Sequence, residues 1–138
     1  MRILITNDDG IDSPGIHELA RYVEQAGHEV VVVAPDFDAS GTATSIGRIA
    51  PDTPIRMQRS SIEGLEGEAY SLAGPPALCV VAGFLEAFGP KPDVVVSGIN
   101  AGLNTGRSTL HSGTVGAALT AQNFGLRGLA VSLETSEN

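Results

Sequence analysis

Short apolar runs alternate with amphipathic stretches along this chain, and the two patterns predict strands and helices in turn. Residues 3–5, 30–34 and 94–96 are continuous apolar runs of Ile, Leu, Val and Ala, which is typical of parallel strands buried on both faces. Between the first two runs, apolar residues recur at helical spacing: Ile16, Leu19, Ala20 and Val23. Ser13 suits the start of this helix and Gly27 its end. The chain is therefore predicted to begin with a strand, a helix and a second strand.

The rest of the chain continues the alternation. A second helix is expected from Pro75 to about Phe88, a third over residues 113–124, and a last strand at residues 129–133. Residues 49–72 have a weaker pattern that suggests a small antiparallel excursion. Together these elements predict a single α/β domain over residues 1–138, with a Rossmann-like, doubly wound, mostly parallel sheet in three α/β/α layers.

Three polar segments follow the predicted strands. They are residues 7–10, 36–41 and 97–106. In a doubly wound sheet, ligands bind outside the carboxyl ends of the parallel strands, near the point where the strand order reverses. We therefore expect these three segments to converge on one site.

Composition and charge narrow the possible functions. The chain has 42% hydrophobic and 17% charged residues, which suits an ordinary globular domain, and its formal net charge of −8 argues against binding a nucleic-acid polymer or an anionic membrane. Cys79 is the single cysteine, so neither an intramolecular disulfide nor a cysteine zinc cluster is expected. The first apolar run is too short for a signal peptide, and no run reaches the roughly 18 residues of a membrane span. A cytoplasmic location is expected.

Two adjacent carboxylates, Asp8 and Asp9, stand at the end of the first strand. Like charges this close repel unless a cation binds or one carboxyl is protonated. Gly10 allows a tight turn in which both side chains serve one site. Oxygen ligands without sulfur favour a hard divalent ion such as Mg²⁺ or Mn²⁺. The alternative interpretation is an ordinary Asx turn that leads into a helix.

A glycine-rich segment after the third strand is the second candidate for chemistry. Closely spaced glycines expose backbone N–H groups, and a following helix N-terminus adds partial positive charge, so an acidic protein can hold phosphate there. The segment matches neither the GxxxxGK[ST] loop nor the GxGxxG fingerprint. The expected phosphate-binding or substrate-binding residues of the three segments are Asn7, Gly41, Gly98, Asn104, Gly106, Ser112, Gly113 and Thr114. The alternative is a merely flexible loop.

Two further side chains of this segment carry weaker hypotheses. His111 is a candidate proton donor, and Arg107 is a candidate cationic partner for phosphate, although an exposed loop arginine is an equal interpretation. His17 and His28 are interpreted as surface residues at the first helix.

Four ordered motifs add a family resemblance. They are MRILITNDDGI at residues 1–11, VAPD at 33–36 followed by Ser40 and Gly41, SGIN at 97–100 followed by Gly102, Asn104 and Gly106, and SGTVGAA at 112–118. Together they resemble the survival protein SurE family of 5′/3′-nucleotidases. The resemblance implies a Rossmann-like domain, a divalent metal and hydrolysis of nucleoside monophosphates. By motif position it implies Asp8, Asp9, Ser40 and Asn100 as metal ligands, with Asp8, Asp9 and Asn100 as catalytic residues.

The resemblance also has departures. Ser108 stands where the family usually has an acidic residue, Leu78 where it usually has Asp, and Gly47 where it usually has Thr. Family members continue well beyond this length, with segments that assist dimer or tetramer formation. The chain is therefore interpreted as a fragment or shortened member, and a homodimer or homotetramer is expected where the full family architecture is present.

The resulting hypothesis is a metal-dependent phosphomonoesterase that hydrolyses nucleoside 5′- and 3′-monophosphates, or other small phosphomonoesters. Two alternatives stay open: a catalytically impaired fragment that binds metal and nucleotide, and a glycosyltransferase-like binder of nucleotide sugars. A receiver-like switch is disfavoured, because the third strand ends in Ser97 rather than in an acceptor aspartate.

Overall fold

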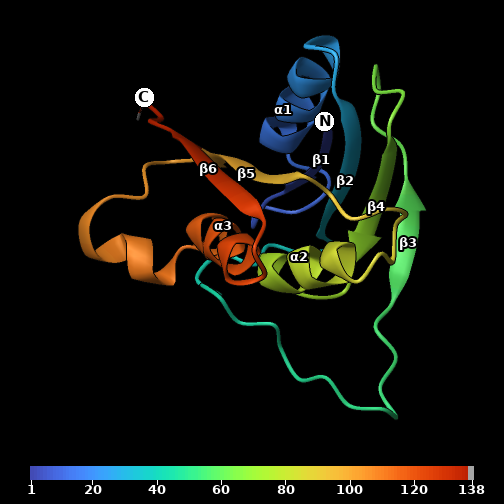
Figure 1. Ribbon diagram of the computed structural model, residues 1–138. Coiled ribbons are helices and arrows are strands. Elements are labelled where there is room, and N and C mark those ends of the chain that lie inside the picture. Colours follow the sequence, from blue (N-terminus) through green and yellow to red (C-terminus); the bar gives the residue numbers. More distant parts are fainter. Residues whose placement is uncertain (137–138) are drawn as a thin grey trace.

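A six-stranded sheet organises the computed structural model, which describes residues 1–136 (Figure 1). Its strand order is β3-β4-β2-β1-β5-β6. Five neighbouring strands run parallel: β1 (Arg2–Thr6), β2 (Glu29–Pro35), β4 (Glu68–Leu72), β5 (Val94–Ala101) and β6 (Arg127–Leu133). The edge strand β3 (Met57–Ser60) pairs antiparallel with β4. The predicted mostly parallel α/β sheet is confirmed, and so is the small antiparallel excursion.

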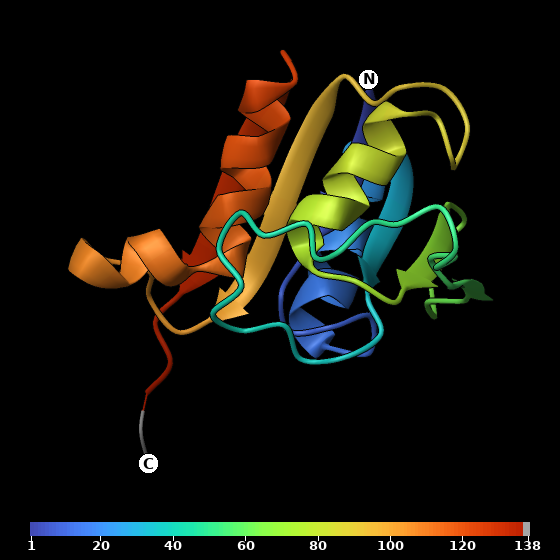
Figure 2. The same ribbon diagram turned by 90° about the horizontal axis from the view of Figure 1, so that it is seen from below.

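Helices cover both faces of the sheet, which gives the three layers. Figures 1 and 2 show α1 (Pro14–Gln25) on one face and α2 (Pro76–Phe84) with α3 (Gly113–Asn123) on the other. Because successive side chains of a strand point to opposite faces, β1 contributes to two separate cores. Ile5 packs in the core beneath α1, whereas Leu4 packs in the core beneath α2 and α3.

Two glycines let helices approach strands closely. A Cβ at Gly83 of α2 would lie 2.2 Å from Cδ1 of Leu4, a fully buried residue of β1. A Cβ at Gly15 of α1 would lie 2.4 Å from the carbonyl oxygen of Ile99 in β5. Both distances are shorter than real Cβ contacts, so a side chain at either position would require its neighbour to move. The first turn of α1 is thus seated directly against the end of β5.

The chain reverses its direction across the sheet between β1 and β5. From β1 the connection through α1 leads towards β2, while from β5 the connection through α3 leads the opposite way to β6. Parallel crossovers are right-handed, so these two connections pass over opposite faces. The order of the strands therefore reverses between β1 and β5, and the carboxyl ends of the strands at such a point are where doubly wound sheets bind ligands.

The structure differs from the predicted boundaries in three places. β5 does not end at Ser97 but continues to Ala101, with an irregularity in its pairing to β6 between Ser97 and Asn100. Residues expected to be loop form the 3₁₀ helix η1 (Gly106–His111). α2 ends at Phe84 rather than near Phe88, because the chain turns there and inserts Phe88 into the core.

A long connection joins β2 to β3 and passes the N-terminal part of α3. Its residues 36–56 are largely exposed, but Ala39 is buried and its N–H donates to the carbonyl oxygen of Asp8 at 2.7 Å. Gly116 of α3 faces the same connection, since a Cβ there would lie 1.9 Å from the carbonyl oxygen of Ala43. The connection is therefore pinned to the carboxyl end of the sheet. No helix within residues 1–136 has the length and apolar character that a membrane crossing needs.

Candidate functional site

The turn after β1 is held by the side chain of Asn7. The Asn7 side chain is fully buried, its Nδ2 donates to the carbonyl oxygen of Gly10 at 2.9 Å, and its Oδ1 accepts from the N–H of Gly10 at 3.1 Å. Gly10 has φ +108°, a conformation that side-chain-bearing residues rarely adopt. Asn7 was predicted to contact phosphate. That role stays a prediction, and the contacts present show a residue that shapes the turn carrying Asp8 and Asp9.

Asp8 is seated at the N-terminus of α3. Only 4% of it is exposed; its Oδ1 accepts from the hydroxyl of Thr114 at 3.1 Å, and its Oδ2 accepts from the Thr114 N–H at 3.3 Å. A Cβ at Gly113 would lie 2.8 Å from the Asp8 Cβ, so the absence of a side chain there permits the approach. A negative charge is favoured at this end of a helix.

Asp9 is half-buried and lacks a partner for one of its oxygens. Its buried Oδ2 accepts no hydrogen bond from residues 1–136. Burial, and next the charge of Asp8, raise the pKa of Asp9 above its usual 3.8, an effect that the backbone of Ala101 partly offsets. A buried carboxylate oxygen without a donor is costly. A positive charge close to this oxygen would lower that cost.

Ser40 lies in the pinned connection after β2. It is exposed, its hydroxyl donates to Oδ1 of Asp38 at 2.6 Å, and its N–H donates to the same oxygen at 3.0 Å. These hydrogen bonds lower the pKa of Asp38. The Ser40 oxygen keeps lone pairs for a ligand. Asp38 was not singled out from the sequence, although an Asp two residues before a Ser is the usual signal of an Asx turn.

Asn100 lies in the irregular part of β5. Its Nδ2 donates to the carbonyl oxygen of Gly102 at 2.8 Å, which fixes the amide and leaves Oδ1 as an acceptor. Gly98, two residues before Asn100, is buried with φ +139°, and a Cβ there would lie 2.3 Å from the carbonyl oxygen of Val131 in β6. Only glycine fits this position. The structure thus leaves an oxygen of Asn100 available at the end of the strand next to β1.

The other predicted phosphate-binding residues fall into two groups. Ser112, Gly113 and Thr114 form the start of α3, where the hydroxyl of Ser112 accepts from the Val115 N–H at 3.1 Å and caps the helix. Gly41 is exposed with φ +83°, in the same connection as Ser40. These residues belong to the segments that meet at Asp8.

Asn104 and Gly106 lie farther along the glycine-rich segment. Nδ2 of Asn104 donates to the hydroxyl of Ser132 in β6 at 2.7 Å. Gly106 begins η1, which also carries the exposed Arg107 and His111 and projects from the rest of the fold (Figures 1 and 2). Phosphate contacts by Asn104 and Gly106, and the roles of Arg107 and His111, stay predictions.

Two buried hydroxyls lie beneath the turn: that of Thr6, which the sequence analysis did not single out, and that of Ser97, which begins the third polar segment. Thr6 and Ser97 are neighbours in the register of β1 and β5, both are fully buried, and neither hydroxyl oxygen has a hydrogen-bond partner within residues 1–136. They are the residues directly before Asn7 and Gly98. Nothing in the local sequence separates such hydroxyls from the polar residues of a turn.

The donor set differs from a cluster of strong metal ligands. Within the described residues 1–136, no group of three or more His, Cys, Asp or Glu side chains is placed to hold a metal. That finding does not test the predicted ligands, because only two of them are carboxylates. The predicted ligands are Asp8, Asp9, Ser40 and Asn100. Such mixed oxygen donors suit Mg²⁺ or Mn²⁺.

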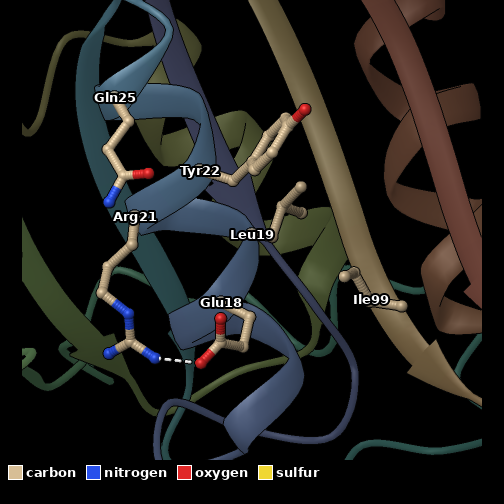
Figure 3. A pocket seen from close by; sticks show the side chains of 6 residues that line it. All are labelled: Glu18, Leu19, Arg21, Tyr22, Gln25 and Ile99. Atoms are coloured by element: carbon tan, nitrogen blue, oxygen red, sulfur yellow. Dashed lines mark hydrogen bonds and ion pairs between the residues drawn. The ribbon is translucent and has the colours of Figure 1, made fainter.

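A hollow of about 250 Å³ lies away from this turn. Figure 3 shows it between the outer side of α1 and Ile99 of β5. Arg21, which lines it, is paired with Glu18 and donates to the carbonyl oxygen of Glu63 at 2.8 Å, so its charge is already engaged. Asp8 and Asp9 do not line it. The candidate site is therefore the turn at the carboxyl ends of β1 and β5 rather than this hollow.

Comparison with known proteins points to one family. The family described as Survival protein SurE matches residues 3–138 of this chain. A protein of Xanthomonas campestris pv. campestris (strain B100), named 5′-nucleotidase SurE, is 44% identical over 138 residues, covering 100% of this chain and 50% of that protein. A protein of the same name from Xylella fastidiosa (strain M12) is 46% identical over 135 residues, covering 98% of this chain and 48% of that protein.

A solved structure agrees with these relatives. The crystal structure of the SurE protein from Aquifex aeolicus is similar with a TM-score of 0.78 and 37% sequence identity, covering 100% of this chain and 53% of that one. This chain thus spans about half the length of the curated relatives it matches.

Proposed function

This chain belongs to the survival protein SurE family, and from that premise we propose that it carries the active site of a metal-dependent phosphomonoesterase. Its proposed substrates are nucleoside 5′- and 3′-monophosphates. The name of the relatives, 5′-nucleotidase SurE, supports the substrate class. The observation that carries the proposal is the buried Oδ2 of Asp9, a carboxylate oxygen without a donor beside a second carboxylate.

The residues present fit a divalent cation. A positive charge would satisfy the unpaired oxygen of Asp9 and remove its repulsion from Asp8, the two effects that make this turn costly without one. We propose Asp8, Asp9, Ser40 and Asn100 as the ligands. When bound, Mg²⁺ or Mn²⁺ would supply positive charge to a phosphoryl oxygen while the phosphorus is attacked.

The two carboxylates are in different environments, which suggests different roles. Both oxygens of Asp8 already accept hydrogen bonds from Thr114, so Asp8 is fixed and weakened as a nucleophile. Asp9 has a buried oxygen with no donor within residues 1–136, so its carboxylate is the less engaged of the two. We propose that Asp9 accepts the proton of the attacking water. A ³²P label from a monophosphate that stays on acid-quenched protein and is removed by hydroxylamine would instead show an aspartyl-phosphate.

Phosphate release by the purified protein tests the proposal. A panel of 5′- and 3′-monophosphates is incubated with EDTA, Mg²⁺ or Mn²⁺, and released phosphate is measured. We expect release that needs metal and is lost in Asp9→Ala. Asp12→Ala is the matched control, because Asp12 is an exposed carboxylate three residues away. No release from any monophosphate would refute the enzymatic proposal.

The same panel separates the competing hypotheses. Metal-dependent binding of AMP without release of phosphate would favour the catalytically impaired binder. Transfer of sugar from a nucleotide sugar, without release from monophosphates, would favour the glycosyltransferase-like alternative. A cytoplasmic location and assembly as a homodimer or homotetramer remain predictions, which fractionation and light scattering test.

A further inference from the structure

The first backbone N–H groups of α3 are largely occupied by protein oxygens. The Thr114 N–H donates to Asp8, the Val115 N–H to the hydroxyl of Ser112, and the Gly116 N–H to the carbonyl oxygen of Ser112. The first turn of a helix offers these donors to caps, solvent or ligands. Here, a carboxylate from another element takes one of them, so this end of the helix serves Asp8.

We propose that Thr114 is a positioning residue that fixes the carboxylate of Asp8 for metal binding; this rests on the proposed function of the same site. It differs from the contact with phosphate that the sequence suggested. Thr114 is fully buried and gives Asp8 both its N–H and its hydroxyl, one to each oxygen. Each carboxylate oxygen keeps a lone pair, and the two hydrogen bonds set the direction of those lone pairs.

Residues other than Thr114 hold the backbone and the Cβ of Asp8 in place. The missing side chain of Gly113 brings the helix against the Asp8 Cβ, and the N–H of Ala39 holds the Asp8 backbone carbonyl at 2.7 Å. The backbone and Cβ are thus fixed by other residues, while the torsion of the carboxylate is fixed by Thr114. Removing the hydroxyl should therefore change ligand orientation more than it changes the fold.

Valine tests this role because it keeps the shape of threonine and the backbone N–H but removes the hydroxyl donor. Mn²⁺ binding to the purified protein is followed by electron paramagnetic resonance. Partners that orient metal ligands typically contribute about 10-fold to 100-fold to affinity. We expect Thr114→Val to weaken Mn²⁺ binding by roughly that factor, and Thr114→Ser, which restores the hydroxyl, to bind within about threefold of the wild type.

Thr120→Val is the matched control. Thr120 lies in the same helix, is 7% exposed, and its hydroxyl donates to the carbonyl oxygen of Gly116 at 2.7 Å, away from Asp8. This variant also loses a buried hydroxyl, but one that donates to a neutral carbonyl of its own helix, so we expect a smaller loss of thermal stability in EDTA and unchanged Mn²⁺ affinity. If Thr114→Val yields no folded protein, Thr114→Ala takes its place, because it removes the same hydroxyl and should weaken Mn²⁺ binding in the same way.

Three outcomes separate this inference from the proposed function. Weakened Mn²⁺ binding in Thr114→Val with rescue by serine supports the inference, even if no monophosphate is hydrolysed. Mn²⁺ affinity equal to that of Thr120→Val overturns it, even if the enzyme is active. A raised KM at saturating Mn²⁺ with unchanged Mn²⁺ affinity would also overturn it, and would assign Thr114 to the substrate phosphate.

Discussion

Gly116→Ala should disturb the site through a backbone contact rather than through a ligand. Gly116 lies in α3, where alanine is the better helix former by about 1 kcal/mol. Its new Cβ would lie 1.9 Å from the carbonyl oxygen of Ala43 and 2.3 Å from the carbonyl carbon. Real Cβ atoms keep at least 3.0 Å from such neighbours. The connection after β2 must therefore retreat from α3 by about 1 Å at Ala43.

The size of the effect depends on where Ser40 lies in that connection. Ser40 is between the fixed Ala39, whose N–H is held by Asp8, and the displaced Ala43. A misplacement of 1 Å can lower activity about 100-fold, and Ser40 shares only part of it, so we expect Mn²⁺ affinity to fall roughly 10-fold. Overpacking costs about 1 to 3 kcal/mol, which offsets the gain in helix propensity and leaves stability lower than in the wild type.

Isothermal titration with Mn²⁺ and urea denaturation in EDTA measure the two effects. Gln122→Ala is the control, because Gln122 is an exposed residue of the same helix and alanine there improves helix propensity without a contact to the connection. Gly116→Ala with wild-type Mn²⁺ affinity and a higher free energy of unfolding would refute the reasoning. It would show that the connection yields without moving Ser40.

Three further predictions follow from the turn and the core. Asn7→Ala should lower the free energy of unfolding by about 2 kcal/mol, because the N–H and the carbonyl oxygen of Gly10 each lose a buried hydrogen bond to the Asn7 side chain. A change within about 0.5 kcal/mol in urea denaturation would contradict this. The pKa of Asp9 in the folded state is raised above its usual 3.8. Ionisation of Asp9 therefore lowers the free energy of unfolding as pH rises from 3.8 through the folded-state pKa. Asp9→Asn in EDTA should thus exceed the wild type in melting temperature at neutral pH, with a gap that closes below pH 3.8; a less stable variant at neutral pH would count against it. Burial raises the pKa of the Cys79 thiol to about 12, so a disulfide reagent at mildly alkaline pH should label it only in urea, and rapid labelling of native protein would be inconsistent with the packing.

The sequence predicted the sheet because its strands are buried on both faces. The run of Val30 to Val33 has no polar interruption and consists of β-branched residues, the pattern that is typical of a parallel strand covered on both faces. Boundaries were less accurate where backbone geometry departs from the usual pattern. β5 was predicted to end near Ser97 because Ser and Gly suit a turn, yet Gly98 keeps the chain beside β6 through its unusual φ. η1 was missed, since six residues show no period.

The site was predicted as a meeting of three segments but not as a set of contacts. Topology alone places the ends of β1 and β5 side by side, and the structure confirms that arrangement. The partner of Asp8 could not be predicted, because Thr114 lies 106 residues away and no spacing rule links the two. The phosphate contact of Asn7 stays a prediction, and its two hydrogen bonds to Gly10 are a structural role that the sequence did not indicate.

The hydrogen bond between Asp8 and Thr114 also has a kinetic consequence. Contacts between residues so far apart close a very long loop, and chains dominated by such contacts fold slowly. During synthesis, Asp8 and Asp9 emerge early, but Asp8 acquires its hydrogen bonds only after α3 has docked. A cation that binds this geometry favours the native state over partly folded chains by mass action. Resistance to proteolysis should therefore report, in one measurement, both completed folding and an assembled site.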